Sequence, residues 1–158
     1  MEKNEKTNVM RVLEQKKLPY TPHFYDPDST LTGGEIADIL GETKEKVFKT
    51  LVTVGKTKKN YVFMIPVDSE LDLKKAAKAC GEKSVDMIKA KELLPLTGYV
   101  HGGCSPIGMK KQFTTFAHAT IESFDRIFFS GGRVGAQVEM TFADLKKAVP
   151  IRTAELTV

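Results

Sequence analysis

Two apolar segments separated by a short polar loop constrain the fold of this chain most. The first segment is KTLVTV (residues 49–54), the second is YVFMIPV (residues 61–67), and the lysine-rich loop GKTKKN lies between them. Apolar segments on either side of a polar turn that contains glycine are typical of a β-hairpin. The sequence therefore predicts two neighbouring antiparallel strands over residues 49–67. Lys49 stands at the start of the first strand, where it is either a surface charge or a functional group held by a rigid strand.

Helical patterns occur on both sides of this hairpin. Residues 8–17 place Val9, Val12 and Leu13 on one face of a helix. Residues 32–41 begin with Thr32 as a possible N-cap and have glutamate three residues later, as in a capping box. Other capping residues and helix breakers predict a turn at 43–47 and helices at 71–81 (ended by Gly81), 90–95 (ended by Pro95) and 141–149 (capped by Thr141).

Extended segments complete the prediction. They are residues 18–25 as an edge segment and residues 84–88, 113–121, 125–132 and 136–140 as strands. The last two pair across a glycine turn, and residues 97–112 form a glycine-rich loop flanked by strands. Because strands and helices do not alternate as regular βαβ units, we expect one α+β domain over residues 1–158. Its mixed sheet curls like a barrel and carries peripheral helices.

The composition restricts the possible functions. The chain of 158 residues can bury a core without disulfides or metals. Cys80 and Cys104 form no CxxC pair, and the three histidines are scattered, so we predict no metal site and no cofactor. No apolar run has the length of a membrane span, and the first residues do not resemble a signal peptide, so we expect a cytoplasmic protein. The net charge of +4 and the lysine clusters favour solvated surfaces over RNA binding on composition alone.

The segment GYVHGGCSPIG, residues 98–108, contains the most reactive side chains. It is not a P-loop, because methionine stands where that motif needs lysine. Cys104 could be a nucleophile with His101 as its base, although no third orienting group is evident. A tight loop without catalysis explains the same residues. The backbone N–H groups of Gly102 and Gly103 are accessible in principle and could hold a carbonyl oxygen or a phosphate.

Four motifs in order carry a resemblance that covers nearly the whole chain. They are VFKTLV, LDLKKAAKACG, TGYVHGGCSPIGMKK and SGGRVGAQVE. With them the chain resembles the YbaK/EbsC family of bacterial Cys-tRNA(Pro) deacylases, which is related to the editing insertion domain of prolyl-tRNA synthetase. The resemblance is to the freestanding branch. It implies a curled mixed sheet with peripheral helices. It also implies aminoacyl-tRNA as the substrate and prolyl-tRNA synthetase as a partner, and it implies that the protein binds neither a membrane nor DNA.

The resemblance also implies roles for individual residues. Lys49 matches the principal functional lysine of the family, and Gly102 matches the glycine whose backbone lies beside the substrate carbonyl. The predicted substrate-binding residues are Tyr25, Thr32, Thr50, Gly103, Ser130 and Gln137. At Thr32 relatives carry phenylalanine, and at Gln137 some carry an acidic residue or serine, so the preferred amino acid is not fixed by the resemblance.

The family resemblance further implies that the thiol of a cysteinyl substrate attacks its own ester, with direct attack by water as the rival route. Three alternatives stay open at this stage. They are an Ala-tRNA(Pro) deacylase, a tRNA- or nucleotide-binding module without catalysis, and a thiol enzyme that uses Cys104.

Overall fold

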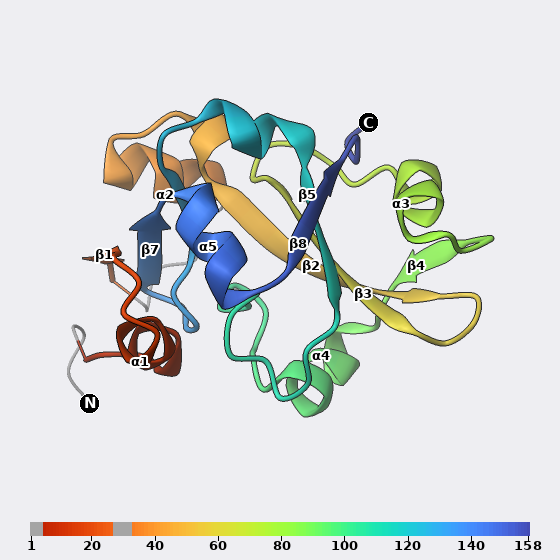
Figure 1. Ribbon diagram of the computed structural model, residues 1–158, viewed down its shortest axis with the longest axis horizontal. Coiled ribbons are helices and arrows are strands. Elements are labelled where there is room, and N and C mark those ends of the chain that lie inside the picture. The colour runs from red at the N-terminus through yellow and green to blue at the C-terminus, as the bar shows by residue number, and fades with distance from the viewer. Residues whose placement is uncertain (1–4, 27–32) are drawn as a thin grey trace.

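The computed structural model describes residues 5–26 and 33–158, and in this part of the chain helices surround two connected β-sheets (Figure 1). One sheet has three strands in the order β1-β7-β6, and the other has five in the order β4-β2-β3-β5-β8. The strands are β1 (Thr21–Phe24), β2 (Phe48–Gly55), β3 (Asn60–Pro66), β4 (Val85–Met87), β5 (Thr114–His118), β6 (Ile127–Ser130), β7 (Ala136–Met140) and β8 (Ile151–Ala154). The helices are α1 (Asn8–Gln15), α2 (Gly33–Leu40), α3 (Leu73–Cys80), α4 (Ala90–Thr97) and α5 (Phe142–Ala148), with short 3₁₀ turns η1 (Lys44–Lys46) and η2 (Ala119–Ser123).

The predicted hairpin is confirmed as β2 and β3. The two strands pair antiparallel from Phe48 opposite Pro66 to Val54 opposite Asn60. The lysine-rich loop forms the turn at the tip, which is closed by a hydrogen bond from the Lys58 N–H to the carbonyl oxygen of Gly55. Figure 1 shows this hairpin projecting on the side of the molecule opposite to α1 and β1.

The five-stranded sheet is mixed because β3, β5 and β8 run parallel. Tyr61 lies opposite Thr114 in the β3–β5 pair, and Thr115 lies opposite Ile151 in the β5–β8 pair. The sequence did not predict β8. The predicted strand at residues 113–121 is shorter than expected, because it ends at His118 and continues as η2.

The two sheets meet at the beginning of β2. Val47, immediately before β2, forms a parallel bridge with Phe128 of β6, whereas β4 pairs only with the other end of β2, at Thr53–Gly55. In the described part of the chain, the stretch Lys49–Leu51 therefore has a partner strand on one side only, namely β3. The α+β class with a curled mixed sheet and peripheral helices is confirmed, and the sheet does not close into a full barrel.

Several predicted helix ends are confirmed by their capping contacts. The Thr141 hydroxyl accepts a hydrogen bond from the Asp144 N–H at 3.1 Å, and Gly81 ends α3 in the left-handed region with φ of 75°. The proposed cap Thr32 lies outside the described residues. The prediction that Pro95 ends its helix is wrong. Pro95 lies inside α4, which continues to Thr97.

The apolar core lies on both faces of the five-stranded sheet. Alternation along β3 sends Val62 and Met64 into the larger cluster, with α1 and the three-stranded sheet, and sends Phe63 and Ile65 into a smaller cluster under α3. The helices of the described part are all too short or too polar to cross a membrane.

Candidate active site in the fork between the two sheets

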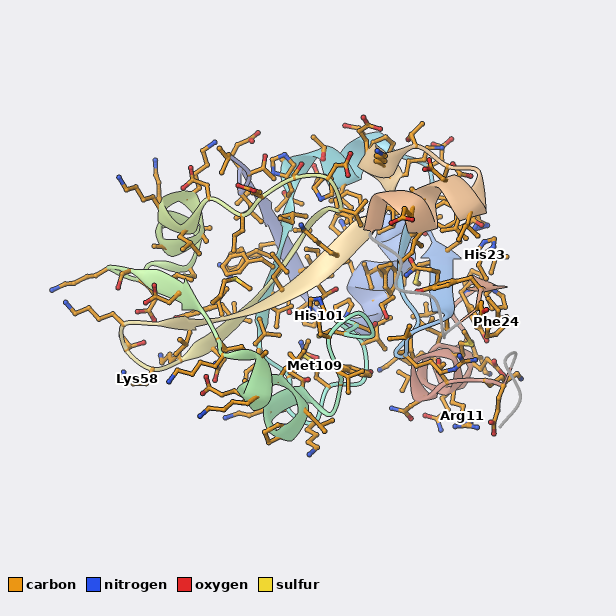
Figure 2. The ribbon with its side chains drawn as sticks, turned by 180° about the vertical axis from the view of Figure 1, so that it is seen from behind. Arg11, His23, Phe24, Lys58, His101 and Met109 are labelled. Atoms are coloured by element: carbon orange, nitrogen blue, oxygen red, sulfur yellow. The ribbon has the colours of Figure 1, made fainter. Side chains whose placement is uncertain are left out.

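A cavity of about 330 Å³ lies beside the first half of β2. It occupies the fork between the join to β6 at Val47 and the join to β4 at Thr53. Its lining includes Lys49, Thr50, Gly102, Ser130 and Gln137, which come from β2, from the glycine-rich loop and from the facing ends of β6 and β7. These five residues were all predicted as site residues. Figure 2 shows His101, which also lines the cavity, near the middle of the molecule beside the long strand β2.

Lys49 lies on the part of β2 that has a neighbouring strand on one side only. It is partly buried and pairs across the hairpin with Ile65. No ion pair or hydrogen bond of its side chain is found among the described residues. Val47 and Thr53 join β2 to other strands on either side of this stretch, so the backbone that carries Lys49 is anchored at both ends. A positive charge is thus held at the cavity without an ion-pair partner in residues 5–26 and 33–158.

In the described part of the chain, two polar atoms of the cavity residues are buried without a hydrogen-bond partner, the Thr50 hydroxyl oxygen and the Gln137 side-chain oxygen Oε1. Gln137 is 6% exposed and lies in the central strand of the three-stranded sheet, opposite Ser130. Buried polar groups without a partner are rare, because each one costs about 1–3 kcal/mol. The Thr50 hydroxyl is therefore available to donate or accept a hydrogen bond with a bound ligand, and the Gln137 oxygen is available to accept one.

Gly102 and Gly103 have different environments, although the sequence predicted the same role for both of their N–H groups. Gly102 has φ of +85°, is exposed and lines the cavity, and its N–H has no partner in the described structure. The Gly103 N–H donates to the carbonyl oxygen of Val100 at 2.9 Å, and Gly103 is not part of the cavity lining. A Cβ atom at Gly103 would lie 2.9 Å from the Cα atom of Arg133, so this glycine permits close packing of two loops. The N–H group that can face a ligand is therefore that of Gly102.

Ser130 lies at the end of β6, where the glycine turn begins. It is 8% exposed and lines the cavity, and its hydroxyl oxygen accepts a hydrogen bond from the Gly132 N–H at 3.2 Å. Arg133, which lies in the same glycine turn, is not part of the lining. The side-chain hydroxyl of Ser130 thus holds the turn and faces the cavity from the same position.

Besides Gly103, two of the predicted substrate-binding residues are not placed at this cavity. Tyr25 is 8% exposed, its N–H donates to the carbonyl oxygen of Gly135 at 2.9 Å, and it does not line the cavity. Thr32 lies outside the described residues, so its position is not assigned.

Cys104 also lines the cavity, but its thiol is poorly suited to be a nucleophile. It is 7% exposed, and burial raises the pKa of the thiol to about 12. The reactive form of cysteine is the thiolate, which is scarce at neutral pH when the pKa is this high. No hydrogen bond between Cys104 and His101 is found in the described structure, so the arrangement of an activated thiol is not present.

An apolar wall completes the cavity, and its residues were not predicted as site residues. It is formed mainly by Ile36 of α2, Val67 after β3 and Leu93 of α4. These side chains follow the periodicity of core residues, so no sequence signal distinguishes them from the core. His101 and Cys104, in contrast, had a sequence signal, because they flank the pair Gly102–Gly103 in the same loop. In the described part of the chain, no group of three or more His, Cys, Asp or Glu side chains lies close enough together to hold a metal ion.

Comparisons with solved structures support this fold. A hypothetical protein aligns with a TM-score of 0.87 at 24% identity over 96% of this chain and 100% of its own, which shows the fold alone. A protein provisionally described as a trans-editing enzyme for prolyl tRNA synthetase aligns with a TM-score of 0.82 at 25% identity. That alignment covers 95% of this chain and 94% of the other.

Comparisons of sequence identify the family. A family model described as "Aminoacyl-tRNA editing domain" matches residues 28–148. A protein of Enterococcus faecalis (strain ATCC 700802 / V583) is 44% identical over 154 residues, which are 97% of this chain and 94% of the relative. It carries the provisional name Cys-tRNA(Pro)/Cys-tRNA(Cys) deacylase EbsC. From the family match, this identity and the shared fold, we conclude that the chain belongs to the aminoacyl-tRNA editing domain family.

Proposed function

We propose that this protein is a trans-editing deacylase that cleaves the ester bond of mischarged Cys-tRNA(Pro). The observation that carries the proposal is the combination in one cavity of a lysine and two buried oxygens, those of Thr50 and Gln137, none of which has a partner among the described residues. The cavity volume of about 330 Å³ is at the lower end of the range for small-molecule sites, which suits one small aminoacyl group. The provisional name of the 44% identical relative supports the same substrate.

In the proposed reaction, Lys49 and Gly102 stabilise negative charge on the ester carbonyl oxygen. Cleavage of an ester develops this charge in the transition state, and fixed donors placed around it are among the strongest catalytic effects in proteins. Lys49 supplies an ammonium group on an anchored strand, and Gly102 supplies an N–H group that is not used within the loop. Thr50, Ser130 and Gln137 would then hold the amino-acid part of the substrate.

The nucleophile in this proposal comes from the substrate. The cysteinyl thiol loses its proton, and its sulfur forms a bond to the ester carbonyl carbon. The bond from that carbon to the ribose oxygen breaks, and the ribose oxygen takes up a proton. Cysteine leaves as a four-membered thiolactone, which water opens to free cysteine. A thiol with a pKa near ~8.5 is partly ionised at neutral pH, so this step does not need a strong base on the enzyme.

The burial of Cys104 is an argument against an enzyme thiol as the nucleophile, and it therefore supports the substrate thiol in this role. Its pKa of about 12 leaves it protonated under the conditions in which aminoacyl-tRNA is stable. Attack by water would give the same final products without the ring, and the amino-acid dependence of the rate separates these two routes.

The proposal is tested by release of labelled amino acid from a panel of charged tRNAs. The panel contains Cys-tRNA(Pro), Cys-tRNA(Cys), Ala-tRNA(Pro) and Pro-tRNA(Pro), and the variant Lys49→Ala serves as the low-activity control. We expect rapid release of cysteine, slow release of alanine and proline, and release of cysteine that is about 10²–10³-fold slower in the variant. Preferred release of alanine would identify an Ala-tRNA(Pro) editor. Binding of tRNA without release of any amino acid would identify a binding module.

We also propose that prolyl-tRNA synthetase supplies the choice of tRNA. The trans-editing neighbour described for prolyl tRNA synthetase supports this partner. If the synthetase selects the tRNA, its addition should raise the rate on Cys-tRNA(Pro) above that on Cys-tRNA(Cys), and without it the two rates should be similar. A single domain over residues 1–158 and a cytoplasmic location are consistent with this role and remain predictions.

A further inference from the structure

A second surface of the protein, away from the fork, is lined by cations. Two open hollows of about 600 Å³ and 750 Å³ share Gln112, Phe113, Thr114 and Arg152, so they adjoin each other at β5 and β8, and together we call them the basic groove. The cationic residues along this basic groove are Lys58, Lys59, Lys111, Lys146 and Arg152. No aspartate or glutamate belongs to the described lining of either hollow. The chain as a whole has 24 basic and 20 acidic residues, so a lining without carboxylates is a marked local excess of positive charge.

The sheet register explains why residues far apart in the sequence meet in the basic groove. The parallel pairing places Tyr61 opposite Thr114 and Thr115 opposite Ile151, so β3, β5 and β8 begin side by side. The lysines at positions 58 and 59 precede β3, Lys111 precedes β5, and Arg152 lies near the start of β8. Each segment therefore delivers its cation to the same end of the sheet. Figure 2 shows Lys58 at this end, remote from His23 in the three-stranded sheet.

These cations are not neutralised by ion pairs. Elsewhere in the described structure, Lys44 lies 3.3 Å from Asp68 and Lys147 lies 3.4 Å from Asp144. None of the five basic groove cations has an ion pair among the described residues. Lys146 lies 4.9 Å from the ring centre of Phe142, which leaves its charge uncompensated.

One carboxylate lies near the groove without lining it. Glu82 is bound by the hydroxyl groups of Thr57 and Tyr61, and its charge also interacts with Lys59. The side chains of Lys58, Lys111 and Arg152 are exposed, and no carboxylate contacts them among the described residues. These three cations are therefore the strongest candidates for contact with an anionic partner.

We propose that the basic groove binds the phosphodiester backbone of the tRNA body while the charged 3′ end occupies the fork cavity. This inference rests on the proposed function for its choice of polyanion. The aromatic rings along the groove, of Tyr61, Phe113 and Phe116, are each no more than 8% exposed, so they offer little surface for stacking of bases. Lysine and arginine contacts to phosphates position a nucleic acid without reading its sequence. The groove therefore strengthens binding of any tRNA and leaves selection among tRNAs to other contacts.

The separation of the two sites fits one continuous nucleic-acid strand. Lys49 pairs with Ile65 at the fork, and Thr53 pairs with Tyr61 at the near end of the groove. These two pairs are four residues apart, which corresponds to about 14 Å along the strand. A stacked nucleic-acid strand advances about 3.4 Å per nucleotide, so the groove would begin about four nucleotides from the 3′ end.

The test compares two triple variants that have the same net charge. The groove variant is Lys58→Gln, Lys111→Gln and Arg152→Gln. The control variant is Lys16→Gln, Lys74→Gln and Lys147→Gln, which removes three exposed charges outside the groove. Binding of uncharged tRNA is measured by fluorescence anisotropy at several salt concentrations. We expect the groove variant to lose about 2–3 units of the slope of log affinity against log salt, and the control to keep its slope.

Catalysis with two substrates separates this inference from the proposed function. One substrate is Cys-tRNA(Pro), and the other is the cysteine ester of adenosine, which has no phosphate. The groove variant should show a raised KM for Cys-tRNA(Pro), an unchanged kcat, and a normal rate on the adenosine ester. Equal salt slopes and equal KM values in both triple variants would overturn the inference even if deacylation is normal. A groove-dependent slope without hydrolysis of either substrate would support the groove and refute the deacylase.

Discussion

The hydroxyl of Thr50, which has no partner among the described residues, leads to an unusual prediction. Its removal should stabilise the protein and weaken catalysis. Thr50 lies on β2 in the fork cavity, and its hydroxyl oxygen is buried without a partner. The substitution Thr50→Val replaces this hydroxyl with a methyl group of similar size and keeps the β-branched shape that suits a strand. In the folded protein without substrate, it removes a buried group that has lost its contact with water.

The size of both effects follows from the energetics of hydrogen bonds. An unpaired buried polar group costs about 1–3 kcal/mol, and we take the lower end because Thr50 as a whole is only partly buried. A gain of about 1 kcal/mol raises the melting temperature of a protein of this size by about 2–4 °C. A hydrogen bond to substrate is worth about 0.5–1.5 kcal/mol, so its loss should lower kcat/KM about two- to thirteenfold.

A matched control lies on the same strand. Thr53 is fully buried, and its hydroxyl donates to the carbonyl oxygen of Tyr61 at 2.9 Å. Thr53→Val should therefore lower the melting temperature and leave kcat/KM unchanged. Calorimetry and steady-state deacylation of Cys-tRNA(Pro) measure the two quantities. If Thr50→Val also lowered the melting temperature and left kcat/KM unchanged, the Thr50 hydroxyl would be a structural group, and its proposed role in substrate binding would be refuted.

Three further variants or substrates test the proposed chemistry. Lys49→Ala should reduce kcat by about 10²–10³-fold while the circular dichroism spectrum stays unchanged, since Lys49 has no partner to lose among the described residues; near-normal turnover would make it a surface charge. Cys104→Ala should retain most of the deacylation rate measured with Cys-tRNA(Pro), because the buried thiol is protonated, and an inactive variant that remains folded would restore the enzyme-thiol mechanism. Ser-tRNA(Pro) should be cleaved orders of magnitude more slowly than Cys-tRNA(Pro), and equal rates would exclude the substrate thiol as the nucleophile.

Local signals predicted most of the elements, but not all of their ends. The N-cap at Thr141 and the stop at Gly81 depend on contacts within one turn, so the sequence contains the necessary information. Pro95 misled the prediction because it lies near the end of a short helix. Proline there removes a single hydrogen bond, while the Thr97 hydroxyl bonds to the Leu93 carbonyl oxygen at 2.7 Å and Gly98 closes the helix.

Pairing between distant segments was not predictable from periodicity. β8 has four residues, its burial does not alternate clearly, and it lies parallel to β5 only after β6, β7 and α5 have intervened. The sequence contains no local feature that specifies this contact. The same limit applies to the basic groove, since its cations belong to three lysine clusters and an arginine that periodicity assigns to separate solvated surfaces.

The candidate site shows a similar division. The family resemblance selected Lys49, Thr50, Gly102, Ser130 and Gln137, and the structure brings all five to one cavity. Their individual roles remain predictions. The difference between Gly102 and Gly103 could not be read from the sequence, because it depends on which N–H group the loop uses internally.

The fork itself accounts for the kind of chemistry that this site can support. When a strand is paired on both sides, neighbouring strands close both of its edges. A ligand then cannot approach the strand from between two sheets. β2 is joined to β6 at Val47 and to β4 from Thr53, and the residues between them have no described partner strand on that side, while both ends are fixed. Such a stretch can hold Lys49 and Thr50 rigidly against a substrate without rearrangement during the reaction, which is what electrostatic stabilisation of a transition state requires. A substrate that brings its own nucleophile needs positioning and charge stabilisation from the enzyme and not a strong base. Among the described residues, the anchored lysine, the unused Gly102 N–H and the two unpaired oxygens are groups that could supply the contributions that the proposed substrate-thiol route needs.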